Sequence, residues 1–177
     1  ERNIMLRELL ITLYLTFVKV VFLLCKAFPL QRKTTFVMSF PGNIPSLVRY
    51  LNEAEPDETI VVIQTKKILD RDLTQKVQHV LPLHHPVHFF RALYHLATSR
   101  YVFVDNYYAF FATTALKPEV MFIQVWHDVG ALKMFGLQDL TNRQRYQRAL
   151  KRFQRVYDRF DTIVVGSESM ADIFKQS

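Results

Sequence analysis

The amino-acid sequence predicts an α/β fold, in which a parallel β-sheet lies between two layers of helices. Strand-like and helix-like segments alternate from residue 34 onward, as they do in βαβ units. The continuous apolar run Thr59–Gln64 is typical of a strand that is buried on both faces of a parallel sheet. Of the 177 residues, 50% are hydrophobic and 14% are aromatic, which is enough to fill the core of one compact domain.

Each element is predicted from its pattern of apolar residues. Short runs rich in β-branched and aromatic residues predict strands at Thr34–Ser39, Thr59–Gln64, Val77–Leu81, Tyr101–Val104, Val120–Val125 and Thr162–Val165. Helical spacing predicts helices at Ile44–Glu53, Val87–Thr98, Tyr108–Leu116 and Arg143–Phe160. In an open parallel sheet, ligands bind beyond the carboxyl ends of the strands, so polar residues there are the first candidates for a functional site.

Glycine and cysteine usage excludes several kinds of site. The four glycines are too far apart to form a dinucleotide-binding G-x-G-x-x-G turn or a Walker-type phosphate loop. The single cysteine, Cys25, excludes internal disulfides and any zinc site built from several cysteines.

The net charge of +7 is concentrated in two short segments. Residues 1–33 carry a net +4 and residues 141–160 a net +6, whereas the rest of the chain sums to −3. Such patches predict an anionic partner, which is a membrane surface, a phosphorylated ligand or a nucleic acid.

The N-terminal segment predicts a helix that lies in a membrane interface. Charged residues interrupt its apolar stretch, and its longest uncharged run, residues 9–18, is shorter than the roughly 20 residues that cross a bilayer. On a helix, Glu8, Lys19 and Lys26 fall within about 20° of one another, a narrow polar stripe that suits lysines reaching toward headgroups. The alternative is a helix buried against another part of the protein. We expect 1–33 to be the membrane-associating segment and 34–177 to be the globular domain.

Polar clusters follow three of the predicted strands. Asp105-Asn106 ends one strand, Trp126-His127-Asp128 ends the next, and a Gly-Ser-Glu-Ser turn that starts at Gly166 ends the last and can cap a helix. His127 has the side chain of a general base near neutral pH, although it also suits a loop hydrogen bond. Asp128 either orients the imidazole or caps the next turn.

A group of histidines does not predict a metal site. His84 and His88 have the i,i+4 spacing of metal ligands on a helix. Pro86 lies between them, however, and makes an unbroken helix there unfavourable.

The predicted helix Arg143–Phe160 has one apolar and one basic face. Its basic row consists of Arg148, Arg152, Arg155 and Arg159. Arginine binds phosphate through two parallel hydrogen bonds, so anionic lipid or pyrophosphate is favoured over nucleic acid, for which no aromatic platform or zinc finger is evident.

The segment Phe122–Gly136 resembles the Gln-x-Trp-His-x-x-x-x-x-Lys-x-x-Gly signature of the CDP-glycerol glycerophosphotransferases of wall teichoic acid synthesis. The strands Tyr101–Asn106 and Thr162–Ser169 are similar to the neighbouring strands of that family, and the resemblance covers about residues 34–177. Gly130-Ala-Leu-Lys-Met-Phe-Gly136 resembles the primase members, whereas polymerising members usually have Gly-Thr-Pro-Leu-Lys after the histidine. Asp128 departs from the small residue common at its position.

The resemblance implies a GT-B-like fold with two Rossmann-like domains. This chain would be the N-terminal, acceptor-side domain, and the C-terminal donor-binding domain would be absent from it. The implied reaction transfers glycerol phosphate from CDP-glycerol to an undecaprenyl-diphosphate-linked disaccharide and releases CMP, without a cofactor or a metal. The implied location is peripheral, on the cytoplasmic face of the cell membrane.

The resemblance also implies residue roles. His127 would be the catalytic base. Contacts to substrate or phosphate are expected from Asp105, Asn106, Asp128, Lys133, Ser167 and Ser169. Contacts to the membrane or a lipid pyrophosphate are expected from Lys19, Lys26, Arg32, Lys33, Arg148, Arg152, Arg155 and Arg159. Alternatives are a poly(glycerol phosphate) polymerase, another GT-B transferase acting on a lipid-linked sugar, and a catalytically silent membrane-binding module. The oligomeric state is left open.

Overall fold

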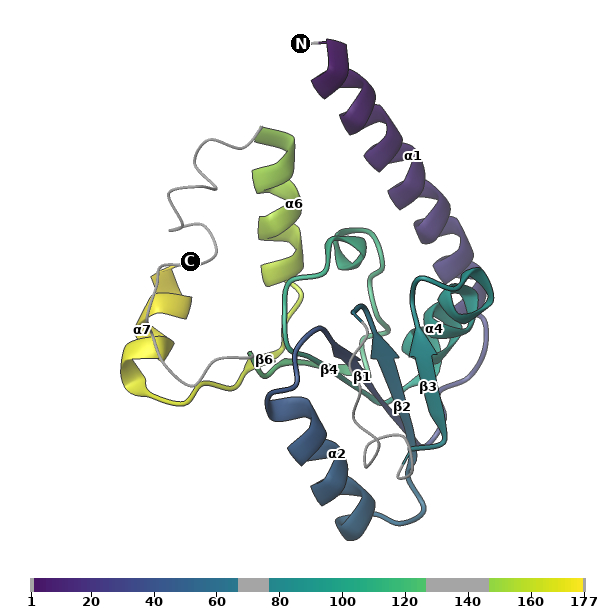
Figure 1. Cartoon of the computed structure of the whole chain (residues 1–177), viewed down its shortest axis with the longest axis vertical. Coiled ribbons are helices and arrows are strands. Elements are labelled where there is room, and N and C mark those ends of the chain that lie inside the picture. The colour runs from purple at the N-terminus through teal and green to yellow at the C-terminus, as the bar shows by residue number, and fades with distance from the viewer. Residues whose placement is uncertain (1, 67–76, 127–146, 177) are drawn as a thin grey trace.

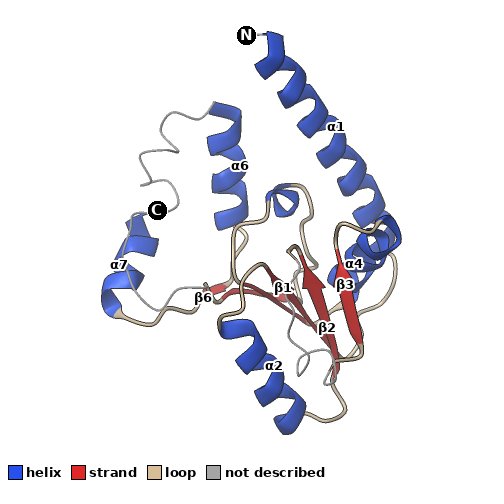
Figure 2. Ribbon diagram, in the orientation of Figure 1, coloured by secondary structure: helices blue, strands red, loops and turns tan. Residues whose placement is uncertain are grey.

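The sheet has six parallel strands in the order β3-β2-β1-β4-β5-β6 (Figures 1 and 2). A computed structural model describes residues 2–66, 77–126 and 147–176. The strands are β1 Lys33–Met38, β2 Thr59–Gln64, β3 His79–Pro82, β4 Tyr101–Val104, β5 Met121–Gln124 and β6 Thr162–Ile163. Every adjacent pair is parallel, so the predicted α/β class and the parallel sheet are confirmed.

The described helices differ from the predicted ones mainly in length. They are α1 Arg2–Cys25, α2 Asn43–Ala54, α4 Pro86–Thr98, the 3₁₀ helix η1 Ala109–Ala112, α6 Gln147–Tyr157 and α7 Glu168–Gln176. The helix predicted at Tyr108–Leu116 is wrong beyond one turn, because the Thr113 and Thr114 hydroxyls both donate to the Phe110 carbonyl, and η1 ends there. The last strand has two of its four predicted residues, and among the described strands it pairs with β5 alone.

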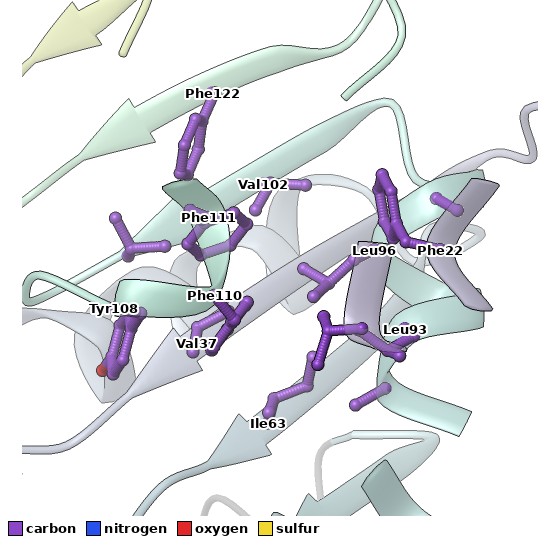
Figure 3. Packing of buried hydrophobic residues seen from close by; sticks show 14 of the residues in the cluster. Phe22, Val37, Ile63, Leu93, Leu96, Val102, Tyr108, Phe110, Phe111 and Phe122 are labelled. Carbon is purple, nitrogen blue, oxygen red and sulfur yellow. The ribbon is translucent and has the colours of Figure 1, made fainter. Parts of the chain in front are cut away.

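One face of the sheet packs against α1, α4 and η1. Val37, Ile63 and Val102 point to this face and are fully buried under Phe22 of α1 and Leu96 of α4. Figure 3 shows these residues with the aromatic rings of η1 and β5 beside them; the rings of Phe111 and Phe122 are 4.5 Å apart. Helix α1 therefore shares the main core of the domain.

The other face packs against α2. Ile44 and Val48 of α2 are fully buried against Phe36 and Met38 of β1 and Val62 of β2. Because side chains alternate along a strand, Val37 points to the first face while its neighbours in sequence point to the second. This alternation produces the predicted three layers.

Helix α1 has a buried face, a polar stripe and an exposed apolar face. Leu15, Val18 and Phe22 are buried, whereas ten large hydrophobic side chains between Met5 and Leu24 are 48–73% exposed. The segment Met5–Cys25 is long and apolar enough to cross a membrane by length and composition alone, and 22% of its most apolar window is buried.

The polar stripe of α1 faces the protein. Glu8 pairs with Arg152 of α6 at 2.8 Å, and Lys26 Nζ donates to the Ala115 carbonyl after η1 at 3.0 Å. Glu8 and Lys26 are therefore bonded to other parts of the protein, whereas Lys19 is exposed. The prediction that lysines of this stripe reach headgroups stays a prediction, and the exposed apolar side chains lie on another face of α1.

Candidate functional site

Three strands end together at the carboxyl edge of the sheet, and a buried carboxylate holds their ends. Asp105, directly after β4, accepts hydrogen bonds from the backbone N–H groups of Ser39 and Phe40, after β1, at 2.9–3.1 Å. The Tyr108 hydroxyl donates to Asp105 Oδ1 at 2.6 Å. The Ser39 hydroxyl is hydrogen-bonded to the hydroxyls of Tyr108 and Thr65. Thr65 follows β2, so the end of this strand is connected to the same network.

These contacts give Asp105 a structural role. Asp105 is only 1% exposed, and its hydrogen bonds from the Ser39 and Phe40 N–H groups fix the turn between β1 and α2. A surface contact to substrate, as expected from its position at a strand end, is not open to it. Burial and the neighbouring Asp105 carboxylate both raise the pKa of Tyr108, so this hydroxyl keeps its proton and remains the donor.

The end of β5 is held in an unusual backbone conformation. Trp126 has φ 53° and is the one described non-glycine residue with positive φ. Its N–H donates to Gln124 Oε1 at 3.0 Å, and its carbonyl accepts from Asn43 Nδ2 at 3.2 Å. Its ring is 7% exposed and lies edge-on to Phe174 of α7, with centroids 5.5 Å apart. A bulky residue in this region costs free energy, and such positions cluster at functional sites.

The candidate base follows Trp126 directly in the sequence. His127, Asp128 and Lys133 lie outside the described residues, so their predicted roles stay predictions. Asn106 is described: its side chain accepts from its neighbour Tyr107 N–H at 2.8 Å, and its carbonyl accepts from Gln124 Nε2 at 3.3 Å.

The predicted serine turn caps a helix. The Ser167 hydroxyl accepts from Met170 N–H at 3.3 Å at the start of α7 and lies 3.0 Å from the Ser169 hydroxyl. Both serines are exposed, beyond the end of β6. They are therefore accessible at the same edge of the sheet as Trp126.

Sequence reasoning missed the residues that fix this edge. Ser39, Asn43, Thr65 and Tyr108 come from four different segments, and each contacts Asp105, Ser39 or the backbone of Trp126. The available signal was their position just after predicted strands. It does not identify their partners.

Basic residues gather between α1, α6 and η1. Two neighbouring cavities, of about 330 and 350 Å³, lie there and share Lys19, Ala112, Thr113 and Arg155. The first is also lined by Arg148, Lys151 and Arg152, and the second by Lys26 and Arg159. We call this pair of cavities the basic groove. It brings together six of the eight cations expected to contact lipid.

Three of those eight cations are engaged differently from the expectation. Lys33 is 1% exposed, and its Nζ donates to Thr98 Oγ1 at 2.6 Å, so the prediction that it contacts lipid is wrong. Burial lowers the pKa of Lys33 to about 8. Arg32 is paired with Glu55 and Glu58 beside α2, away from the groove. Arg152 lines the groove, but Glu8 neutralises it.

The histidines lie along β3 and α4. Pro86 is the first residue of α4, so His84 lies outside the helix that contains His88. The His79 and His95 rings are 5.0 Å apart, and burial lowers the pKa of His95 to about 3. Over the described ranges, no three His, Cys, Asp or Glu side chains are arranged to hold a metal ion.

The fold and the Trp-His strand end agree with a family assignment. Residues 21–177 match the model of the CDP-glycerol:poly(glycerophosphate) glycerophosphotransferase family, and the chain belongs to this family. It is 36% identical to a teichoic acid glycerol-phosphate primase of Bacillus spizizenii, over 92% of this chain and 43% of the relative. It is 31% identical to the Bacillus subtilis protein of the same description, over 97% of this chain and 46% of the relative. The chain thus spans less than half of each relative.

Solved structures show the same fold. The wall teichoic acid polymerase TagF, in an H444N variant soaked with CDPG, superposes with a TM-score of 0.55 at 14% identity, over 82% of this chain and 36% of that one. An H548A variant of the same polymerase gives the same TM-score. At this identity the likeness establishes the fold alone.

Proposed function

We propose that this chain is the N-terminal, acceptor-side domain of a GT-B-like glycerophosphotransferase. The enzyme would transfer glycerol phosphate from CDP-glycerol to a membrane-bound undecaprenyl-diphosphate-linked disaccharide and release CMP. The observation that supports this best is the strand end Gln124-Val-Trp126, which lies at the carboxyl edge of the sheet in a member of this family and is followed in sequence by His127. The similarity to two primases extends over 92% and 97% of this chain, which favours priming over polymerisation.

In the proposed reaction, His127 takes the proton from an acceptor hydroxyl. The oxygen attacks the β-phosphorus of CDP-glycerol, a new P–O bond forms, and the bond from that phosphorus to the CMP oxygen breaks. Lys133 neutralises charge on the phosphates, and Asn106, Asp128, Ser167 and Ser169 hold the substrates. Catalysis of this kind consists mostly of positioning and charge stabilisation, so the reaction is written without a cofactor or a metal.

The described part of the site is suited to fixing the strand end that precedes the proposed base. Trp126 is buried, its backbone is bound on both sides by Gln124 and Asn43, and Asp105 fixes the adjacent strand end. The strand end before the proposed base is therefore fixed by hydrogen bonds, and catalysis of this kind depends on positioning. His127 follows this strand end directly in the sequence, which supports it as the base.

The membrane location is proposed from the outward face of α1. That face is apolar over its whole length, and it continues onto α4, where Phe90 is 45% exposed and meets Phe17 edge-on at 6.1 Å between centroids. Contiguous exposed apolar surface of this kind marks an interaction site, and a bilayer interface is the partner that suits a long helix of this composition. We propose peripheral attachment at the cytoplasmic face.

The test of the reaction is product analysis with the purified enzyme. CMP release from CDP-glycerol is expected only when the lipid-linked disaccharide is present, and mass spectrometry of the lipid product should show one added glycerol phosphate. A ladder of additions would instead assign the enzyme to the polymerases. CMP release without acceptor at the same rate would contradict a transferase.

The test of the base is substitution of His127. His127→Ala is expected to lower kcat by roughly 10²–10⁴-fold, the usual contribution of an acid–base group, and to abolish the ascending limb of the pH–rate profile. Asp128→Asn is expected to cost less. Near-normal turnover by His127→Gln would leave the histidine with a hydrogen-bonding role only.

A further inference from the structure

The basic groove contains cations without balancing acids. Glu8 is the acid on this side of α1, and Arg152 engages both of its carboxylate oxygens, at 2.8 and 3.2 Å. In the described part of the chain, Lys19, Arg148, Lys151 and Arg155 form no ion pair. Like charges held close together repel, so the folded chain retains a repulsion that a bound anion would relieve.

One arginine that lines the groove has an unused hydrogen-bond donor among its described contacts. Arg159 lines the second cavity and donates through Nη2 to the Ala112 carbonyl at 3.1 Å. Its Nη1 is buried and has no hydrogen-bond partner among the residues that the structure describes. A buried guanidinium nitrogen without an acceptor costs free energy, and a phosphate oxygen is an acceptor that suits it.

The groove borders the exposed apolar face of α1. Phe22 and Leu23 line the second cavity, and Leu23 is 54% exposed. Figure 1 shows α1 and α6 extending from the same side of the sheet, with η1 at the base between them. Cations inside the groove and hydrocarbon along its border match a ligand that has an anionic head and an apolar chain.

We propose that the basic groove binds the phosphate or diphosphate head of a membrane amphiphile, with Lys19 and Arg155 as its central ligands. Both residues line both cavities, so they are placed to contact two linked phosphates, one in each cavity. The amphiphile's chain would follow the apolar face of α1 into the bilayer. This inference rests on the proposed membrane attachment and adds a defined site for the headgroup.

The test compares two double variants with equal loss of charge in the purified protein. Lys19→Gln with Arg155→Gln removes the two shared cations. Arg49→Gln with Arg100→Gln removes a half-buried cation on α2 and an exposed cation before β4, both outside the two cavities. Binding is measured by sedimentation with neutral phosphatidylcholine vesicles that contain a small fraction of polyprenyl diphosphate.

The groove variant is expected to bind these vesicles about 25-fold more weakly, from about fivefold for each cation near a lipid phosphate. The control variant is expected to change by less than about twofold, because its two cations do not line the groove and charges outside it are screened by salt. Equal losses in the two variants would overturn the proposal, since only net charge would then matter. Wild-type affinity in the groove variant would overturn it as well.

The source of the phosphate is identified with a second set of vesicles. Phosphatidylglycerol at matched surface charge replaces the polyprenyl diphosphate. If the wild type binds more strongly than the groove variant only when polyprenyl diphosphate is present, the site is assigned to a lipid-linked diphosphate. If the difference in binding is equally large with phosphatidylglycerol, the site is assigned to phospholipid headgroups. Either result supports the shared chemistry.

A measurement without membranes separates this inference from the proposed attachment. Inorganic pyrophosphate is expected to raise the Tm of the wild type, but not of the groove variant, relative to sodium chloride at equal ionic strength. If the wild type binds no vesicles, the attachment fails, and this thermal shift still tests the groove. Equal shifts in both proteins would contradict the groove.

Discussion

At the scale of single residues, a buried carboxylate and a buried hydroxyl hold the carboxyl edge of the sheet. Tyr108 is 7% exposed and donates to Asp105, which is 1% exposed. Removing one donor from a buried carboxylate costs more than removing a neutral hydrogen bond, because the charge stays behind with fewer partners. The hydroxyl of Tyr108 thus matters for stability although it need not touch substrate.

Tyr108→Phe is expected to lower the free energy of unfolding by about 1.5–3 kcal/mol, the range for a hydrogen bond to a charged group. Urea denaturation monitored by circular dichroism measures the change. Tyr50→Phe is the control, since Tyr50 is 71% exposed. A Tyr108→Phe protein as stable as this control would contradict the role given to the hydroxyl.

His95 is the second residue whose burial has a measurable consequence. Burial lowers its pKa from 6.5 to about 3, so the unfolded chain binds a proton at His95 at pH values where the folded chain does not. Stability is therefore fully present above pH 6.5 and falls as the pH drops from 6.5 toward 3.

The expected slope from this residue is about 1.4 kcal/mol per pH unit for one proton. His95→Gln should show a shallower loss of stability than the wild type across this window, measured by urea denaturation at a series of pH values. His84→Gln, the same substitution at an exposed histidine before α4, is the control for the change of side chain. Parallel curves for wild type and His95→Gln would disprove the assignment.

At the scale of elements, one ion pair connects the two helices that form the basic groove. Glu8 of α1 and Arg152 of α6 are 11% and 16% exposed at their side chains, and they are 144 positions apart in sequence. The hydrogen bond from Arg152 lowers the pKa of Glu8, so the pair contributes stability at neutral pH and loses it as the pH falls through this lowered pKa.

Arg152→Met is expected to destabilise the protein by about 1–3 kcal/mol, because it leaves a largely buried carboxylate without its partner. The double variant Glu8→Gln with Arg152→Met should recover most of this loss. Lys175→Met serves as the reference, since the Lys175–Asp172 pair is 75% and 65% exposed and is expected to contribute little. Thermal or urea unfolding gives all three values, and no recovery in the double variant would contradict the pair.

At the scale of the whole molecule, the exposed apolar residues form two sets, one along α1 and one outside this helix. Leu13 and Phe17 of α1 are 58% and 51% exposed, while Tyr50 and Met121, outside α1, are 71% and 46% exposed. Only the α1 set is continuous along a helix of 24 residues. The membrane proposal therefore predicts that these two sets differ in their effect on attachment.

Leu13→Ser with Phe17→Ser is expected to weaken binding to vesicles by at least about tenfold, because two large apolar side chains no longer enter the interface. Tyr50→Ser with Met121→Ser should leave binding unchanged. Binding to anionic vesicles should also weaken with salt, which reports the basic residues. If the wild type binds to no vesicle, the apolar face of α1 is instead covered by protein, which is the alternative raised by its sequence.

The amino-acid sequence by itself determined the parallel α/β sheet, most strand positions, the Trp-His strand end and the basic helix. These follow from local patterns: Thr59–Gln64 is apolar throughout because both of its faces are covered, and the arginine row repeats with the period of a helix. Only the tertiary structure decided which way each charge points. The sequence places Glu8 and Lys19 on the same stripe of a helix, and only the packing of α6 beside α1 pairs Glu8 with Arg152. The sequence also places Lys33 just before a predicted strand, whereas β1 begins at Lys33 and the residue is buried. Periodicity is set within one element, whereas the partner of a charge is chosen between elements far apart in the chain, so no local pattern specifies it.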